Sequence, residues 1–169
     1  MFDLKIFNSL NYEERLKTMV SMLEGLVSGD DEDITKLCNA SSLIKALLGK
    51  VNWCGFYLMK NDKLVLGPFQ GMPACTKIEI GKGVCGISAK YKRVLRVDNV
   101  HEFEGHIACD AASNSEIVLP IVYANKCLGV LDIDSNEFNR FTEIDEKYLI
   151  ESVKILLKFV RFEWIFKNN

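Results

Sequence analysis

The sequence predicts an α+β fold, in which one central antiparallel sheet carries N- and C-terminal helices packed on one face. Three observations lead to this prediction. Residues 11–48 show helical apolar periodicity, residues 51–134 contain two hairpin patterns rich in β-branched and aromatic residues, and the segment after Thr142 is again helical. Strand runs flanked by helical runs are typical of a sheet that has its helices segregated to one side.

Two helices are expected in the first quarter of the chain. In residues 11–27 the apolar side chains recur at helical spacing, namely Leu16, Met19, Val20, Leu23 and Leu26 or Val27. The acidic residues 30–33 begin the next helix, because acidic side chains favour the positive end of a helix dipole. This second helix ends at Gly49 and has Cys38 on its apolar stripe. We therefore expect Cys38 to be a core residue.

The expected strands form two groups. Residues 51–58 and 61–69 pair as a hairpin, and residues 75–80 add a third strand. A glycine-marked turn leads into a short helix within residues 81–93, which precedes a short strand at 94–100 and a loop at 101–115.

Residues 116–123 and 127–134 form the second expected hairpin, where Pro120 indicates a sheet edge or a bulge. The last helix begins after Thr142, a favourable N-cap, with Asp145 at the capping-box position.

Composition restricts the classes of function. The 169 residues suit one domain, expected to span 1–169, and the net charge of −2 favours neither nucleic acid nor an anionic membrane as partner. No apolar run is long enough to cross a membrane, and the first residues do not resemble a signal peptide, so we expect a cytoplasmic protein. In that reducing compartment the six cysteines should be mainly thiols, and their spacing predicts no metal site.

The unusual side chains concentrate on one expected face of the sheet. Trp53 and Tyr57 lie four residues apart on the first strand, and Asp132 and Asp134 lie two apart on the last, so each pair shares a face. Glu116 begins the neighbouring strand. An aromatic wall with convergent polar groups is typical of a small-molecule pocket. The alternatives are that the aspartates are solvated at a strand end and that the aromatic residues are simply core.

The loop 101–115 contains Cys109 among small and polar residues, which is unusual for a buried structural cysteine. Carboxylates near a thiol keep its pKa at or above the free value, which argues against a protease-like cysteine paired with His106. A substrate activated by an acid and then attacked by a thiol fits better. Cys75 follows a turn, and Cys85 stands at a helix start, where the dipole favours thiolate. Both could approach Cys109, whereas Cys54 and Cys127 are expected to be packing residues.

Five segments together resemble the free methionine-(R)-sulfoxide reductases, which are single GAF-domain enzymes. These are VNWCGFYL, LGPFQGMPAC, IGKGVCG, GHIACDAASNSEIVLP and GVLDIDS. The resemblance covers about residues 10–158. A looser GAF pattern, Asn125-Lys126, Phe141 and Asp145-Glu146, has a structural explanation in an ion pair between Lys126 and Asp145.

The resemblance implies reduction of the free R-sulfoxide with Cys109 as the nucleophile, which becomes a sulfenic acid. Cys75 would then form the disulfide and thioredoxin would restore the thiols, although Cys85 stays open both as first nucleophile and as resolving cysteine. Trp53 and Tyr57 would contact the substrate, and Glu116, Asp132 and Asp134 would hold its ammonium and sulfoxide oxygen. The proton donor would be Glu116 or Asp134.

No cofactor is implied besides thioredoxin as an external reductant. The terminal amphipathic helices make a homodimer the expected assembly. The alternative function is a GAF sensor module that binds a small molecule and does no chemistry. A sensor would bind its ligand equally well with Cys109 replaced by serine, which distinguishes the two hypotheses.

Overall fold

The computed structural model describes residues 7, 9–107 and 111–165. Within them, helices α1 (Tyr12–Val27) and α2 (Asp33–Leu48) precede the sheet and α4 (Glu143–Phe159) follows it. The strands are β1 (Trp53–Lys60), β2 (Lys63–Gln70), β3 (Lys77–Glu79), β4 (Leu95–Val97), β5 (Ser115–Tyr123) and β6 (Lys126–Ser135). Helix α3 (Gly83–Tyr91) lies between β3 and β4, and the short 3-10 turns are η2 (Val100–Glu102) and η3 (Phe162–Trp164).

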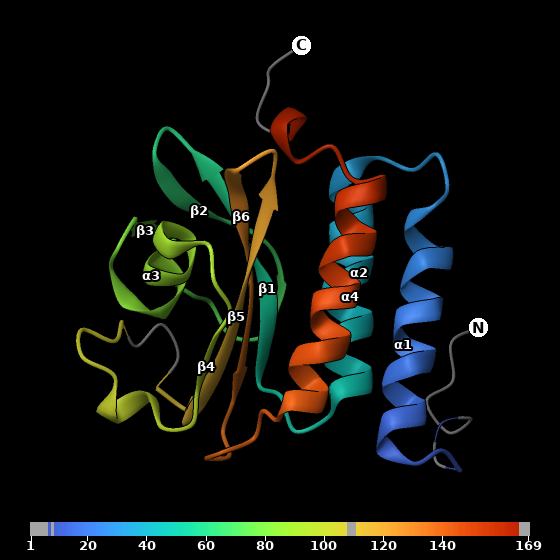
Figure 1. Ribbon diagram of the computed structural model, residues 1–169, viewed down its shortest axis with the longest axis horizontal. Helices are drawn as coiled ribbons and strands as arrows, with labels where there is room; N and C mark the ends of the chain where they lie inside the picture. The colour runs from blue at the N-terminus through green and yellow to red at the C-terminus, as the bar shows by residue number, and fades with distance from the viewer. Residues whose placement is uncertain (1–6, 8, 108–110, 166–169) are drawn as a thin grey trace.

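The strands form one antiparallel sheet in the order β3-β2-β1-β6-β5-β4 (Figure 1). The two predicted hairpins, β1–β2 and β5–β6, lie side by side because β1 pairs with β6. Strand β4 pairs with residues 116–118 of β5, so Pro120 lies where no described strand pairs with β5 on that side. A register irregularity follows between Ile121 and Val122. Both features agree with the interpretation of Pro120.

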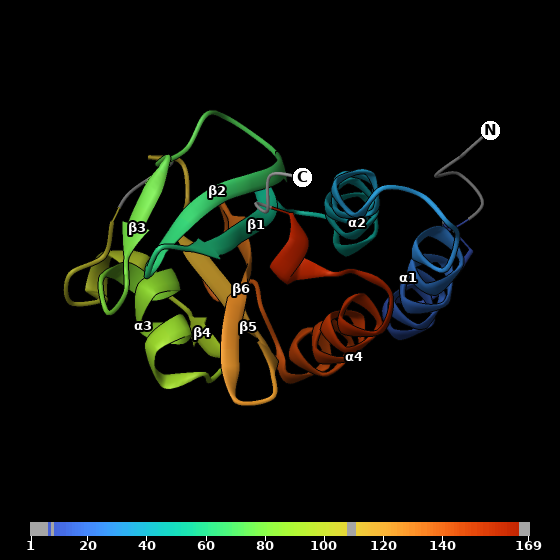
Figure 2. The same cartoon turned by 90° about the horizontal axis from the view of Figure 1, so that it is seen from above.

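The helices occupy the two sides of the sheet unequally. Helices α2 and α4 pack on one face, and α1 packs on both of them as an outer layer (Figure 2). Helix α3 lies on the opposite face (Figure 2). The predicted α+β fold is confirmed, with the refinement that α1 contacts the other helices. No helix among the described residues is long and apolar enough to span a membrane.

Helix boundaries follow local chemistry at both ends of the chain. Asn11 and Glu14 form a capping box at the start of α1, and Thr142 and Asp145 form the predicted one at the start of α4. These reciprocal bonds satisfy backbone N–H groups that the helix itself leaves unpaired.

The buried stripe of α2 differs from the predicted one at Cys38, which is exposed. The stripe is rotated so that Asp33, Lys36 and Ala40 face inward beside Leu37 and the later leucines. Asp33 accepts bonds from the backbone N–H and the guanidinium of Arg161, and Lys36 Nζ donates to the carbonyl of Phe159 at 3.2 Å. These bonds allow charged residues to turn inward, so the expectation of a core Cys38 was wrong.

The expected ion pair between Lys126 and Asp145 was also wrong. Asp145 is fully buried and pairs with Arg140, whose Nη1 lies 3.3 Å from each carboxylate oxygen. Asp145 also accepts bonds from Thr142 and from the Tyr12 hydroxyl. Lys126 lies at the exposed turn between β5 and β6. The carboxylate therefore joins α1 to α4.

Candidate functional site

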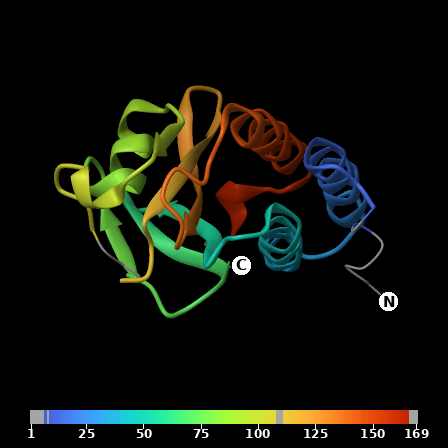
Figure 3. The same cartoon turned by 90° about the horizontal axis from the view of Figure 1, so that it is seen from below.

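Strand register brings the predicted site residues that lie on strands onto one face of the sheet. Helix α3 covers that side of the sheet (Figure 3). Asp134 is directly opposite both Trp53 on β1 and Glu116 on β5. One step along the same face, Asp132 is opposite Gly55 and Val118. Residues opposite one another in a sheet share a face. The predicted convergence of the three carboxylates near the aromatic pair is therefore present.

An aromatic wall, defined here as Trp53, Tyr57 and Phe69, lies along this face. The ring of Trp53 stacks between Tyr57, with centroids 5.9 Å apart, and Phe69, at 5.2 Å. Gly55 makes room for this arrangement, because a Cβ there would lie 2.7 Å from the indole and 2.3 Å from the Cβ of Phe69. Phe69 was not predicted from the sequence as part of this wall. Its position opposite Gly55 in the expected β1–β2 hairpin could have indicated it.

Both hydrogen-bond donors of the wall are used. The indole N–H of Trp53 donates to the carbonyl of Met72 at 3.1 Å, and the hydroxyl of Tyr57 donates to the carbonyl of Cys75 at 3.0 Å. The side chains of Trp53 and Tyr57 are about 1% exposed. The wall thus combines an apolar surface with fixed contacts to the segment that carries Cys75.

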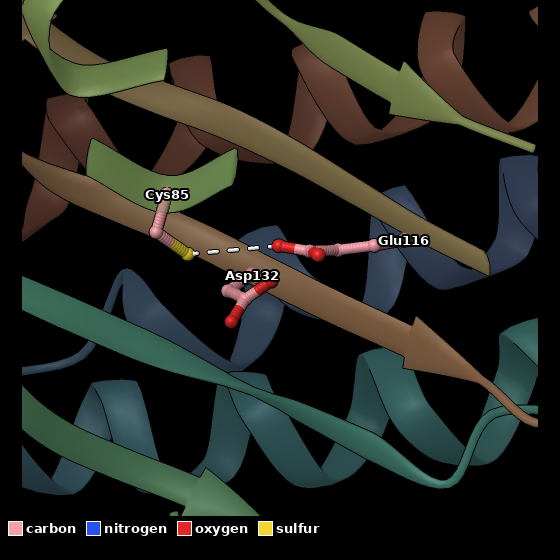
Figure 4. A group of neighbouring side chains, drawn as sticks. All are labelled: Cys85, Glu116 and Asp132. Carbon is pink, nitrogen blue, oxygen red and sulfur yellow. Dashed lines mark hydrogen bonds between the residues drawn. The ribbon is translucent and has the colours of Figure 1, made fainter. Parts of the chain in front are cut away.

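Cys85, Glu116 and Asp132 form a buried acid–thiol cluster (Figure 4). The Sγ of Cys85 donates to Oε1 of Glu116 at 3.9 Å, and one oxygen of Asp132, Oδ1, is buried without a hydrogen-bond partner among the described residues. Burial raises the pKa of Glu116 well above its usual range, and the charge of Asp134 adds to this. Burial likewise raises the pKa of Asp132, and Glu116 raises it further. The cluster therefore favours the protonated forms of its carboxyl groups.

Cys85 does not have the thiolate character that its place at a helix start suggested. It lies in the first turn of α3 and is 4% exposed. Burial raises the pKa of its thiol well above the usual range, and the carboxyl groups of Asp132 and Glu116 act in the same direction. The dipole of this nine-residue helix would lower the pKa of a thiol in its first turn. Burial and the two carboxyl groups raise the pKa of Cys85 by more than the dipole lowers it.

The cavity beside this cluster is small. Its volume is about 20 Å³, and Ser113, Ile107 and His106 line it together with the acid–thiol cluster and Asp134. Ser113 and Ile107 carried no signal in the sequence that distinguishes them from other loop residues. His106 Nε2 lies 3.6 Å from Oε2 of Glu116, and burial lowers the pKa of His106. A space of this size holds about one water, so lining groups must move to admit an amino acid.

The other cysteines differ in whether they form a disulfide and in how deeply they are buried. Cys75 is disulfide-bonded, whereas Cys38, Cys54, Cys85 and Cys127 are free thiols. Cys54 is buried and Cys127 is half-buried, which agrees with their expected packing roles. Cys109, the proposed nucleophile of the sequence analysis, lies outside the described residues.

Thiol exposure leads to a chemical prediction. In the folded protein, iodoacetamide should alkylate Cys38 quickly and Cys85 slowly, because Cys38 is exposed while Cys85 is buried with a raised pKa. Mass spectrometry after timed quenching measures both rates, with buried Cys54 as the matched slow control. Unfolding in guanidinium should remove the difference. Equal rates at Cys38 and Cys85 in the folded state would contradict the buried environment of Cys85.

The acid–thiol cluster is also the place where a cation could bind. Cys85, Glu116 and Asp132 each offer a ligand atom, and these atoms lie within 4.8 Å of one another. Among the described residues this is the one such group of acidic, thiol or imidazole side chains. The thiol and the two carboxyl groups become negatively charged when they lose their protons. The cluster would therefore suit an ammonium group as well as a metal ion.

A second prediction concerns the effect of pH on stability. The folded-state pKa of Asp132 lies above its unfolded value of about 3.9. The protonated carboxyl group of Asp132 therefore contributes its full stabilisation below the unfolded-state pKa. This stabilisation is lost as pH rises through the raised folded-state pKa. Asparagine does not titrate, so Asp132→Asn lacks this loss. The free energy of unfolding of Asp132→Asn should therefore increase relative to that of wild type as pH rises. Urea unfolding at several pH values measures this, and the exposed Asp62→Asn should show no such trend.

Comparison with known proteins identifies the class to which this fold and site belong. A sequence model of the GAF domain matches residues 33–155. The chain belongs to the GAF domain family, as the resemblance implied.

Close relatives specify the group within that family. The chain is 53% identical over 133 residues to the free methionine-R-sulfoxide reductase of Escherichia coli (strain K12), covering 79% of this chain and 81% of the relative. It is 42% identical over 159 residues to that of Saccharomyces cerevisiae, covering 89% and 88%. A Neisseria meningitidis structure, a free methionine-R-sulfoxide reductase in complex with its substrate, superimposes with a TM-score of 0.87 at 38% identity and 93% coverage of both chains. Within the GAF domains, the chain belongs to the free methionine-R-sulfoxide reductases.

Proposed function

We propose that this protein reduces free methionine-(R)-sulfoxide to methionine, using cysteine thiols as the source of electrons. The observation that carries the proposal is the buried acid–thiol cluster beside an aromatic wall. Its carboxyl groups have raised pKa values, so it can supply a proton to a sulfoxide oxygen. The names of relatives that share most of the chain support the substrate.

The site suits an amino acid with a free ammonium group. Asp132 and Asp134 would provide negative charge for the ammonium, and no lysine or arginine stands among the residues described around the cavity. The ammonium would replace protons on these aspartates while Glu116 keeps its proton for the sulfoxide oxygen, and the aromatic wall would contact the S-methyl end. A peptide-bound residue lacks the free ammonium, so it would leave buried carboxyl groups unpaired and be rejected.

The first chemical step would transfer oxygen to a thiol. Cys109 would attack the sulfoxide sulfur and form a transient S–S bond, while Glu116 donates a proton to the oxygen and then receives the thiol proton of Cys109. The hydroxyl group next moves from the substrate sulfur to the sulfur of Cys109, so that the substrate S–O bond and the transient S–S bond both break. Methionine leaves with its sulfur reduced, and Cys109 carries the oxygen as a sulfenic acid. Cys85 is the weaker choice of nucleophile, because its thiol is buried with a raised pKa. Asp134, half-buried and opposite Glu116, is the alternative proton donor.

The second step would form a disulfide. The thiol of Cys75 would attack the sulfenic sulfur of Cys109, releasing water and leaving an S–S bond. The disulfide-bonded state of Cys75 and the free thiol of Cys85 support Cys75 as the resolving cysteine. Thioredoxin would return two electrons and two protons by thiol–disulfide exchange in the cytoplasm.

A homodimer is the assembly we propose. Exposed apolar side chains on the helical side of the molecule, including Leu26 on α1 and Ile34 on α2, support an interface there. Sedimentation velocity measures the mass directly, and a monomer at micromolar concentration would contradict this part of the proposal.

Methionine formation from the free R-sulfoxide, with dithiothreitol as reductant, tests the function. Wild type and the exposed-thiol control Cys38→Ser should turn over, and Cys109→Ser should not. Turnover that survives in Cys109→Ser and disappears in Cys85→Ser would move the nucleophile to Cys85. No turnover by folded wild-type protein would reject the enzyme and favour the GAF sensor, whose ligand would bind equally well without Cys109.

A further inference from the structure

The two polar atoms of the aromatic wall both bind the segment 71–76, which carries Cys75. The indole N–H of Trp53 donates to the carbonyl of Met72 at 3.1 Å, and the hydroxyl of Tyr57 donates to the carbonyl of Cys75 at 3.0 Å. Gly71 packs directly on the indole, because a Cβ at this position would lie 2.4 Å from Cδ1 of Trp53. The segment thus contacts the wall at Gly71, Met72 and Cys75.

The start of the segment is otherwise exposed, whereas Ala74 and Cys75 are half-buried against the apolar residues of this face. Residues 71–73 are exposed and belong to neither a helix nor a strand, and the side chain of Met72 is 65% exposed. Its far end is joined to β2 by a bond from the N–H of Leu66 to the carbonyl of Thr76 at 3.1 Å. Trp53 and Tyr57, by contrast, are buried and stacked on one another. The rigid partner in these contacts is therefore the wall.

We propose that Trp53 and Tyr57 are positioning residues for the Cys75 disulfide, holding the segment 71–76 where Cys75 can form and keep that bond. The inference rests on the proposed function, in which Cys75 is the resolving cysteine. The aromatic wall would then have two roles, namely contacting the substrate and holding the segment 71–76. Binding through the backbone carbonyl fixes the main chain of Cys75 and leaves its Sγ available for exchange.

The physical reason is effective concentration. Forming a disulfide within one chain depends on how often the two sulfurs meet, and a tethered segment meets its partner more often than a free one. Contacts that hold the segment in the oxidised state therefore stabilise the disulfide, and by linkage the disulfide stabilises those contacts. Removing one hydrogen bond should shift the equilibrium toward the two thiols.

The test is a redox equilibrium without any sulfoxide. The full-length protein is equilibrated in mixtures of reduced and oxidised dithiothreitol, in which protein disulfide and reduced reagent form as protein thiols and oxidised reagent are consumed. Rapid alkylation and mass spectrometry measure the oxidised fraction of Cys75. Tyr57→Phe should lower the equilibrium constant for disulfide formation about fivefold, the effect of one neutral hydrogen bond. This corresponds to a reduction potential about 20 mV higher.

Two further variants complete the design. Trp53→Phe keeps an aromatic ring but loses the N–H donor, so it should shift the equilibrium in the same direction and substitutes for Tyr57→Phe if that variant does not fold. Tyr123→Phe removes a hydroxyl that is exposed at the end of β5 and should leave the equilibrium unchanged. Equilibria within twofold of wild type for both wall variants, or an equal shift in Tyr123→Phe, would overturn the proposal. Because no substrate is present, this outcome is independent of whether the protein reduces methionine sulfoxide.

Discussion

Glu116→Gln is expected to lower kcat for the free R-sulfoxide by about 10²–10⁴-fold, the usual contribution of a positioned general acid. Glu116 is 5% exposed, and burial together with Asp134 raises its pKa, so its carboxyl group keeps a proton that it can donate to a higher pH than an exposed glutamate would. Glutamine keeps the shape and hydrogen-bonding capacity of the neutral acid but cannot release a proton. The loss should therefore appear in the chemical step more than in substrate binding. Single-turnover methionine formation measures that step directly.

The control for this experiment is Glu104→Gln, which neutralises an exposed carboxylate in the segment before the site. It should have wild-type activity. The rate of wild type should also fall as pH rises above the raised pKa of Glu116, whereas the residual rate of Glu116→Gln should lack that decline. Full activity in Glu116→Gln would transfer the acid role to Asp134, and Asp134→Asn would then show the large loss.

Arg140→Met should cause a large loss of stability, about 3–5 kcal/mol in the free energy of unfolding, as expected when one partner of a buried ion pair is removed. The guanidinium of Arg140 donates to both oxygens of Asp145, to the Tyr12 hydroxyl and to the carbonyls of Leu48 and Gly49. The Arg140 side chain is 8% exposed and that of Asp145 is not exposed. Methionine would leave a buried carboxylate uncompensated and two carbonyls without their donors.

Chemical denaturation measures this loss, and two variants calibrate it. Arg96→Met breaks a half-exposed pair with Glu146 and should cost less than about 1 kcal/mol. Combining Arg140→Met with Asp145→Asn should recover part of the loss, because the unpaired charge is then absent. A cost below 1 kcal/mol for Arg140→Met would show that Asp145 finds another partner or takes up a proton.

The shared face of the aromatic pair and the carboxylates could be predicted from sequence because it depends on local geometry. Side chains alternate along a strand, so the spacing of Trp53 and Tyr57, and that of Asp132 and Asp134, places each pair on one face whatever the rest of the chain does. The second hairpin then brings Glu116 opposite Asp134. The five matching segments identified the family, which the relatives confirm.

The expectations that failed concern what packs against a residue. Cys38 has helical spacing suitable for the core, but tertiary bonds made by Asp33 and Lys36 turn α2 and expose it. Cys85 stands at a helix start, but burial and two carboxyl groups raise its pKa. Asp145 pairs with Arg140 because the segment before α4 brings that side chain inward.

The sequence by itself thus determined the fold class, the family and the faces of the strands, since backbone periodicity and motif order are properties of the chain alone. Only the tertiary structure decided which carboxyl groups hold protons, which thiols are accessible and which segment the aromatic wall binds. These properties depend on desolvation and on contacts between residues far apart in the chain. For example, the hydrogen bond from the hydroxyl of Tyr57 to the backbone carbonyl of Cys75 could not be predicted from the positions of these two residues in the sequence.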